Sequence, residues 1–545
     1  MTTIDPHVAG HGATAVAGAR TGDRRGVLTS VADWITSTDH KKIGRLFVGT
    51  SLLVLLAVAA IGALLGAERI DATSDFIDAG ALPQLFSAYR VLLTFGVVVP
   101  LGLGVAISVV PLQLGARALA FPRLAMAGFW GWLVGAILVI VSIAANGGPG
   151  GGDSNMVDLF LAAHVLVVAG LVAAAGALST SVLTTRAPGM NMRRVPLFSW
   201  SALVYAIGLV LALPVLAGTL ILLYVDHRYA RTTFGGNTGL SGWLGYAFTQ
   251  PATVLYAVPV FGLLLETVAT ATRKRLPMRS IGLIGIGLVG TAFLAGVAQV
   301  DASLPRNILD MNFVDAMKDI IPYLLLNGLP LLGAVVVLLV FLLAAAGRPR
   351  VLSPMVFSFF GAGMVLVGLL GNAVYRVGDA QLAGTVFEEG AWIYVCYGTV
   401  LAAMGGVVYW GPKLWGRVIA DIKALPLALL GVLATILASL PYYVAGFADQ
   451  PANATQFDYS GPQNLWNILA TVGHGLMLLT VLAFIGLAVT SFRKGEFAGD
   501  DPWDGQTLEW ATSSPAPFSN FAEVHTVASA EPLLDLKPSR TEGNA

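Results

Sequence analysis

Twelve long apolar runs constrain this chain more than any other feature of its sequence. A helix needs about 20 mostly apolar residues to cross a bilayer core of ~30 Å. Such runs lie near 46–66, 85–111, 124–145, 156–183, 197–225, 242–271, 280–300, 320–346, 353–375, 389–411, 424–446 and 465–491. Unpaired backbone groups in hydrocarbon cost several kcal/mol each, and the runs lack the alternation of barrel strands. The sequence therefore predicts an all-α membrane protein, a bundle of twelve transmembrane helices.

Composition excludes several other classes of protein. The 545 residues are 56% hydrophobic and only 11% charged, which is too few charges to cover the surface of a large water-soluble protein. The single cysteine, Cys396, excludes a disulfide framework and any metal site built from several thiolates. There is no basic stripe for nucleic acid, no phosphate-binding loop, no zinc-protease motif and no nucleophile-elbow serine.

Lysine and arginine are distributed unequally between the two ends of the spans. Of the 31 such residues, 24 fall on the ends that share a side with both termini, six fall on the other ends, and Arg90 lies inside a span. Because positive charge accumulates on the cytoplasmic side, both termini are expected in the cytoplasm. We divide the chain into a cytoplasmic segment, 1–44, a transmembrane domain, 45–491, and a cytoplasmic tail, 492–545.

Four polar residues at membrane depth are candidates for a functional site, because ionisable groups are rare there. Arg90 and Glu266 could neutralise each other across the bundle, or each could bind backbone carbonyls and waters. His164 and His474 could ligate one haem if they faced each other, whereas a lone intramembrane histidine is more often a packing residue.

Five acidic residues lie near the non-cytoplasmic ends of their spans. They are Asp301, Asp310, Asp315, Glu388 and Glu389. A solvated rim is the simpler interpretation, and an entrance for cations or protons is the alternative. In the tail, Trp503 and Trp510 stand among acidic residues, a composition typical of a segment that packs on a neighbouring surface.

Short motifs around the spans carry a family resemblance. They are Thr38-Asp39-His40-Lys41-Lys42-Ile43-Gly44, Val110-Pro111-Leu112-Gln113-Leu114-Gly115-Ala116, Ala120-Phe121-Pro122-Arg123-Leu124, Arg186-Ala187-Pro188-Gly189-Met190, Tyr409-Trp410-Gly411-Pro412-Lys413 and Asp501-Pro502-Trp503-Asp504-Gly505-Gln506-Thr507-Leu508-Glu509-Trp510. Together they resemble subunit I of the haem-copper oxidases, specifically the actinobacterial type of cytochrome c oxidase, along nearly the whole chain. The resemblance implies the same twelve-helix fold, a bacterial plasma membrane and cytochrome c oxidase activity.

The same resemblance implies two haems and one copper, held by six histidines. In this chain the ligand of the low-spin haem in the second span falls on Tyr89, and the two haem ligands of the tenth span fall on Gly390 and Trp392. The copper ligand of the sixth span falls on Gln250, and the histidine pair expected near 299–303 is absent. Two histidines at membrane depth cannot replace six. We therefore predict no haem, no copper and no catalytic residue.

Residues that support the metal centre in the family are also replaced. The resemblance places the aspartate of one proton path at Ala118, the lysine of the other near Pro330, and the two arginines that hold the haem propionates at Tyr442 and Tyr443. Alanine and proline carry no proton, and two tyrosines do not neutralise two carboxylates.

Three functions follow as hypotheses. The first is a redox-inactive homologue of cytochrome c oxidase subunit I, a structural or assembly subunit that joins other membrane subunits of a respiratory complex. In it, Tyr89 and Trp392 fill the former haem space. The second is an electron-transfer protein with a reduced haem set, ligated through His164 and His474 or through Tyr89. The third is a transport or gas-conducting protein, suggested by Arg90 and Glu266.

Overall fold

The computed structural model describes residues 32–71, 76–235, 243, 251–300, 302–457, 462–523 and 525–536. Two compact units divide the chain, residues 1–37 and residues 38–545. The described part of the first unit, 32–37, contains one helical turn. The second unit contains the helical bundle together with the described part of the tail, so the tail does not form a separate compact unit.

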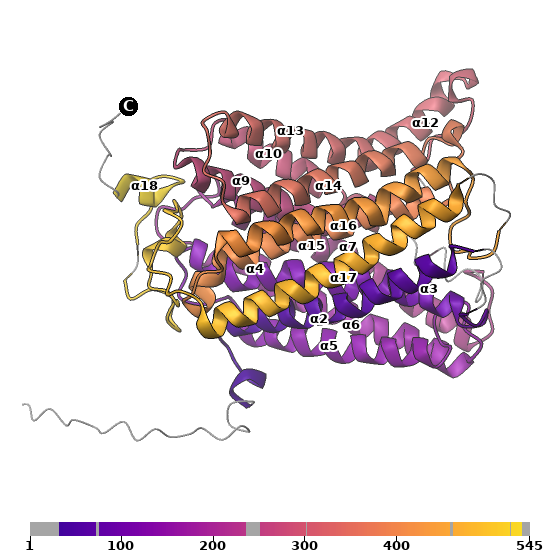
Figure 1. Cartoon of the computed structure of the whole chain (residues 1–545), viewed down its shortest axis with the longest axis horizontal. Coiled ribbons are helices and arrows are strands. Elements are labelled where there is room, and N and C mark those ends of the chain that lie inside the picture. Colours follow the sequence, from indigo (N-terminus) through magenta and orange to yellow (C-terminus); the bar gives the residue numbers. More distant parts are fainter. Residues whose placement is uncertain are drawn as a thin grey trace, which may run out of the picture. The chain divides into compact units, whose positions relative to one another are not determined.

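Helices follow one another along the second unit (Figure 1). They are α2 (His40–Glu68), α3 (Leu82–Val91), η1 (Leu92–Val98), α4 (Val99–Gln113), α5 (Pro122–Ala144), α6 (Ser154–Thr184), α7 (Leu197–Arg228), η2 (Pro251–Ala257), α9 (Val258–Thr272), α10 (Arg279–Gly290), α11 (Phe293–Ala298), η3 (Ile308–Asp310), α12 (Phe313–Tyr323), η4 (Leu324–Gly328), α13 (Leu329–Ala345), α14 (Ser353–Tyr375), η5 (Gly378–Ala380), α15 (Val386–Trp415), α16 (Asp421–Phe447), α17 (Gln463–Lys494), η6 (Leu508–Ala511) and α18 (Pro532–Leu536).

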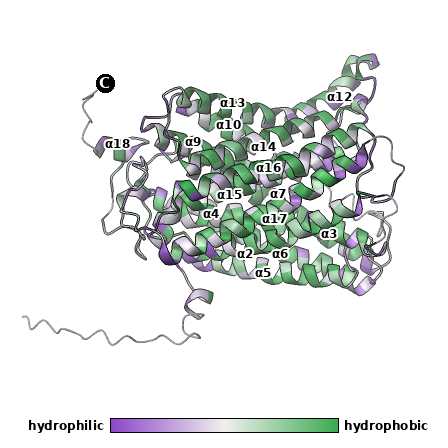
Figure 2. Ribbon diagram, viewed as in Figure 1, coloured by the Kyte–Doolittle hydropathy of each residue, from purple (hydrophilic) through white to green (hydrophobic). Residues whose placement is uncertain are grey.

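Twelve helical segments of the described residues are long and apolar enough to cross a membrane. They coincide with the twelve runs of the sequence, and the predicted all-α fold is confirmed. Apolar residues continue along the helices, whereas hydrophilic residues gather at the two ends of the bundle (Figure 2). The second, sixth and tenth segments, Leu82–Gln113, Thr253–Thr272 and Val386–Trp415, are almost entirely buried by the others and form the centre of the bundle.

Two boundaries differ from the predicted ones. The eighth segment begins at Phe313 rather than near 320, because the Asn312 side chain caps the helix by accepting a hydrogen bond from the Asp315 amide at 3.0 Å. The sixth segment was expected from 242, but residues 244–250 lie outside the described residues, and its described part spans Thr253–Thr272.

Glycines allow neighbouring helices to approach closely. A Cβ atom at Gly170 of α6 would lie 2.4 Å from the backbone nitrogen of Trp132 in α5, and one at Gly361 of α14 would lie 2.6 Å from the carbonyl oxygen of Gly398 in α15. No side chain fits at either position. Small residues of this kind hold membrane helices together because they bring the two backbones into van der Waals contact.

The two ends of the bundle differ in what covers them. We call the end at which α2 begins and α17 ends the tail face, and the other end the opposite face. On the tail face, His40 Nδ1 lies 3.0 Å from Ile107 O and His40 Nε2 lies 3.0 Å from Asn520 Oδ1, and both oxygens are acceptors. Lys41 donates to Asn520 Oδ1 at 3.0 Å. Trp503 of the tail is buried and donates to Tyr409 O at 2.8 Å. The tail is thus an integral layer of the structure.

Candidate functional site

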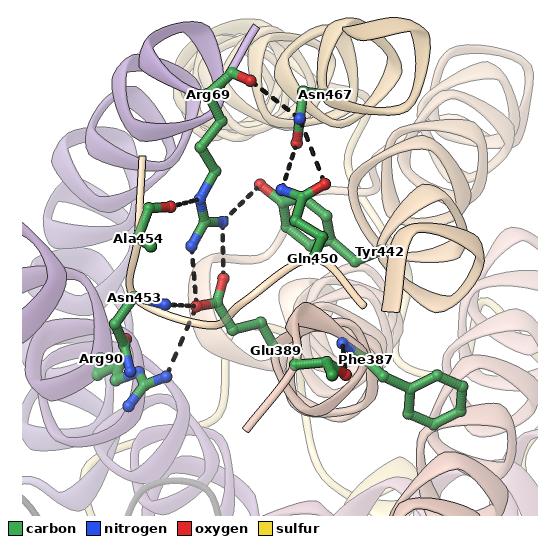
Figure 3. A network of polar contacts seen from close by, with 10 residues as sticks. Arg69, Arg90, Phe387, Glu389, Tyr442, Gln450, Asn453, Ala454 and Asn467 are labelled. Carbon is green, nitrogen blue, oxygen red and sulfur yellow. Dashed lines mark hydrogen bonds and ion pairs between the residues drawn. The ribbon is translucent and has the colours of Figure 1, made fainter. Parts of the chain in front are cut away.

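A buried ion pair lies at the opposite face of the bundle. Arg69, the residue after α2, donates from Nη1 to Glu389 Oε2 at 2.8 Å and from Nη2 to Glu389 Oε1 at 3.0 Å. Arg90 Nη2 lies 3.7 Å from Glu389 Oε1, and the Asn453 amide donates to the same oxygen at 3.2 Å. Figure 3 shows Arg69, Arg90 and Asn453 converging on the Glu389 carboxylate. A pair with two parallel hydrogen bonds is the strongest arrangement of guanidinium and carboxylate.

Neighbouring elements bind the rest of Arg69. Its Nε donates to Ala454 O at 3.0 Å, its Nη1 donates to Tyr442 Oη at 3.1 Å, and its own carbonyl accepts from Asn467 at 2.9 Å (Figure 3). Burial by itself lowers the pKa of Arg69, but the Glu389 carboxylate and Tyr442 outweigh burial and raise it above its ordinary value. The guanidinium is therefore a permanent charge that ties α2 to α15, α16 and α17.

This network corrects the predicted pairing of Arg90 with Glu266 and, in part, the predicted solvated rim. The hypothesis that Arg90 and Glu266 neutralise each other is wrong, because Arg90 pairs with Glu389 at the opposite face. Glu266 accepts hydrogen bonds instead from Thr507 and from the Phe198 amide, at 3.1 and 3.3 Å. The second and sixth spans cross the bundle in the same direction. Arg90 lies in the first third of the second span, and Glu266 lies near the end of the sixth, so the two residues are at different depths.

The solvated rim predicted at the opposite face holds only for part of the acidic set. Asp310 is exposed and Asp315 is partly exposed, whereas Glu389 is only 5% exposed and belongs to the ion pair. Asp301 lies outside the described residues. Sequence reasoning missed Arg69, because a charge at a helix end is usually solvated and its partner lies 320 positions away.

Three aromatic rings pack below this pair. Tyr89 of α3 meets the ring of Trp392 of α15 edge to face at a centroid distance of 5.4 Å, and it meets His474 of α17 at 5.7 Å. His474 shares a hydrogen bond of 2.8 Å between its Nδ1 and the hydroxyl of Tyr397. All four side chains are buried. Tyr89 and Trp392, which the sequence aligned with two haem-ligand positions, are therefore brought together, and His474 joins them.

Little space is left among these rings. The cavity lined by Tyr89, Trp392, His474, Arg69 and Glu389 has a volume of about 10 Å³, which is the space of one water molecule at most. Position 390, the other aligned haem ligand, has no room for a side chain. A Cβ atom at Gly390 would lie 2.9 Å from Ser439 O and 3.0 Å from the ring of Tyr443.

His164 has a separate environment. Its ring contacts Phe95 and Phe160 at centroid distances of 5.2 and 5.6 Å, and neither of these residues is a ring partner of His474. Among the described residues, the two histidines therefore pack against different aromatic rings. Aromatic packing accounts for His164.

Three further positions that the resemblance aligned with the metal centre form hydrogen bonds within the bundle. Tyr442 accepts from Arg69, and Tyr443 donates to Val367 O at 3.1 Å. Gln299, in the stretch where the histidine pair was expected, donates to Thr219 Oγ1 at 3.1 Å. Gln250, the aligned copper position, lies outside the described residues.

A second buried polar cluster lies at the tail face, where the composition of the tail predicted that it packs on a neighbouring surface. Glu509 of the tail accepts hydrogen bonds from Gln113 at 3.0 Å and from Trp410 at 3.2 Å. Burial raises the pKa of Glu509, although the hydrogen bond from Gln113 acts in the opposite direction. Glu266 is close enough for the two carboxyl groups to affect each other electrostatically. This cluster holds the tail against α4 and α15.

Twelve apolar spans, of which the second, sixth and tenth are almost fully buried by the others, define a polytopic α-helical membrane protein with buried polar clusters at both ends. The family model described as "Cytochrome C and Quinol oxidase polypeptide I" matches residues 42–476. The chain therefore belongs to this family, the subunit I family of the haem-copper oxidases.

Relatives match along most of their own lengths. The chain is 30% identical to a "Probable cytochrome c oxidase subunit 1" of Bradyrhizobium diazoefficiens, over 93% of this chain and 78% of the relative. It is 27% identical to the cytochrome c oxidase subunit 1 of Bacillus subtilis, over 92% and 82%. It is also 27% identical to the quinol oxidase subunit 1 of that organism, over 94% and 81%. Relatives with different electron donors thus match about equally well.

The residues present at the aligned low-spin haem position do not fit a haem. Iron there needs two axial donors on opposite sides of a macrocycle, whereas Trp392 offers no lone pair on its ring nitrogen and Gly390 offers no side chain. The space is occupied by packed rings. Among the described residues, no group of three or more His, Cys, Asp or Glu side chains is arranged to hold a metal ion.

Proposed function

We propose that this chain is a redox-inactive homologue of cytochrome c oxidase subunit I that acts as a structural or assembly subunit of a respiratory complex in the bacterial plasma membrane. The observation that carries the proposal is the packing of Tyr89, Trp392 and His474 at the aligned haem position, which leaves a cavity of only about 10 Å³. The subunit I names of the relatives support membership of a multisubunit complex.

The roles of the retained motifs support a structural function. His40 and Lys41 of the first motif bind Asn520, and Gln113 and Trp410 of later motifs bind Glu509. These contacts fix the tail to the bundle. Residues of the shared motifs therefore fix the tail to the bundle, whereas the aligned haem-ligand positions carry Tyr89, Gly390 and Trp392. Such a pattern is expected where the fold and its docking surfaces are needed and electron transfer is not.

An absorption spectrum with metal analysis tests the redox part of the proposal. We expect the full chain, purified from its own membranes, to show no stoichiometric Soret band and no stoichiometric iron or copper. The Tyr89→Phe variant is the matched control, because it keeps the ring and removes the only oxygen of Tyr89 that could ligate iron. A stoichiometric Soret band that decreases in Tyr89→Phe would overturn the proposal in favour of a haem protein.

Affinity purification in mild detergent tests the structural part. The tagged chain is expected to co-migrate with other respiratory membrane subunits on native gels, equally for wild type and Tyr89→Phe. A deletion strain should lose assembly of that complex and regain it with either version. Normal assembly without the chain, together with migration of the chain by itself, would refute the structural role whatever the spectrum shows.

A further inference from the structure

An apolar cleft of about 350 Å³ lies between α2, α4, α15 and α17, in the half of the bundle nearest the tail face. Its floor is formed by Val105 of α4, Gly406 of α15 and Phe484 of α17. In Figure 1, α2 and α17 run side by side along this part of the bundle. The volume lies within the range of known ligand pockets, about 300–1,000 Å³.

The cleft opens sideways, toward the bilayer. Leu53 of α2 and Phe492 of α17 line it and are 61% and 55% exposed. Both residues belong to membrane-spanning segments, so their exposed surfaces face lipid chains. Gly49 widens the opening, because a Cβ atom at this position would have no neighbour within 4 Å. A hydrocarbon chain can therefore enter the cleft from the membrane without passing through water.

The floor of the cleft has no polar group to offer a ligand. The Ser108 hydroxyl donates to Gly104 O within its own helix at 2.8 Å, and the Trp410 indole donates to Glu509 at 3.2 Å. The occupant of the floor is therefore apolar, since a polar group would lose its hydrogen bonds there. A hydrocarbon chain also fills volume whose walls would otherwise lack van der Waals partners.

The end of the cleft nearest the tail face differs from the floor. Arg45, in the second turn of α2, and Trp415, the last residue of α15, line this end. Within the described residues, the buried indole nitrogen of Trp415 has no hydrogen-bond partner. From Arg45 to Leu53 the helix rises by about 12 Å, which gives the cleft a charged end at the membrane surface and a deep apolar end.

We propose that the cleft binds one acyl chain of an anionic phospholipid, with the lipid phosphate and ester oxygens at Arg45 and Trp415. The chain occupies the floor between α4, α15 and α17. Guanidinium groups bind phosphate through paired hydrogen bonds, and tryptophan N–H groups are common partners at the membrane surface. Lys42 precedes Arg45 in the same helix and adds positive charge, whereas Lys41 is buried and pairs with Asp39 at 2.9 Å. The inference does not depend on whether the protein is redox-inactive.

Native mass spectrometry of the full chain, released from its own membranes in mild detergent, tests the proposal. We expect wild type to retain one phospholipid, identified by its mass as anionic. The Gly49→Leu variant fills the cleft and should reduce the retained fraction by about tenfold, corresponding to ~1.4 kcal/mol. The Gly486→Leu variant is the matched control. Gly486 lies in α17 at about the same depth in the membrane as Gly49 in α2, it has open space at its Cβ position, and it does not line the cleft.

A second variant separates the head group from the chain. Arg45→Gln should keep a bound phospholipid but lose the preference for anionic over zwitterionic lipid when both are supplied at equal concentrations. Thermal unfolding of each variant confirms that it is folded. Retention of an isoprenoid molecule instead of a phospholipid, equal retention by Gly49→Leu and Gly486→Leu, or no retained lipid in wild type would each refute the proposal.

Discussion

Arg69 and Glu389, which are 320 positions apart in the sequence, form a bidentate ion pair that is almost completely buried. The pair lies directly beside Tyr89 and Trp392 and lines the same small cavity. It therefore closes the opposite face of the bundle above the aligned haem position, and four helices depend on it for their alignment.

Replacing Glu389 should be strongly destabilising. Glu389→Gln leaves the buried guanidinium of Arg69 without its counter-charge, and breaking a buried pair in this way costs about 3–5 kcal/mol. Unfolding in detergent, followed by circular dichroism, measures the loss. The control is Arg90→Gln. Arg90 is 3.7 Å from Glu389 with a side chain 22% exposed, and we expect its loss to cost less than about 1 kcal/mol. Equal losses of stability in the two variants would show that Arg90 contributes as much as Glu389 to the stability of the buried ion pair.

Adding one methyl group at Gly390 should disturb the contact between α15 and α16. A Cβ atom there meets the backbone oxygen of Ser439 at 2.9 Å, so Gly390→Ala is expected to cost about 1–3 kcal/mol through overpacking. Gly363→Ala in α14, where a Cβ atom meets nothing within 4 Å, should be neutral or stabilising by up to about 1 kcal/mol. An unchanged melting temperature for Gly390→Ala would show that the helices can separate at this point.

Restoring histidines at the aligned haem positions should not restore haem. The double variant Tyr89→His with Gly390→His places imidazoles at two aligned sites, but Trp392 and His474 continue to occupy the space, and position 390 has no room for a ring. We expect it to show no Soret band when it is expressed with a haem supply. A band of full intensity would mean that the rings move aside.

Removing the Trp392 side chain should create a cavity. Trp392→Ala is expected to cost about 3–5 kcal/mol, because the surrounding helices relax only partly into the space, and the new cavity should bind xenon or benzene. Trp392→Phe is the matched control. The buried indole nitrogen has no hydrogen-bond partner among the described residues, so only the loss of volume remains, and a smaller cost is expected. Similar costs for both variants would contradict this account.

Docking of the tail should weaken as the pH rises. The docked carboxyl of Glu509 has a raised pKa, so it binds a proton more tightly than a solvated glutamate, whose pKa is about 4.3. Its contribution is fully present below that value and is lost as the pH rises through the pKa of the docked state. Hydrogen exchange of residues 503–516 measures docking. Glu509→Gln should remove this pH dependence, whereas Glu523→Gln, at an exposed position of the tail, should retain it.

The spans were predictable from sequence because each crossing must bury its own backbone in hydrocarbon, which makes length and apolarity sufficient signals. The position of Tyr89 was predictable from the resemblance. The rings around it were not, because His474 and Tyr397 come from helices that lie next to α3 only after the bundle has closed.

Charges at helix ends were the weakest part of the sequence reasoning. Arg69 was counted with the residues outside the spans, and Glu389 was assigned to a solvated rim. Hydropathy is averaged over many residues, so it does not show which side chain in the last turn of a helix points into the bundle. The supposed pairing of Arg90 with Glu266 failed for a related reason. Depth along a span can be estimated from sequence, but the direction in which each side chain points cannot.

The contact between His40 and Asn520 has a consequence for biosynthesis. His40 starts the first span. Its Nδ1 pairs with Ile107 O, whereas its Nε2 pairs with a residue that leaves the ribosome 480 positions later. Until then, His40 and Lys41 lack the contacts that Asn520 makes with both of them. A premature stop before codon 520 would therefore leave a first span whose polar start is without its tail partner.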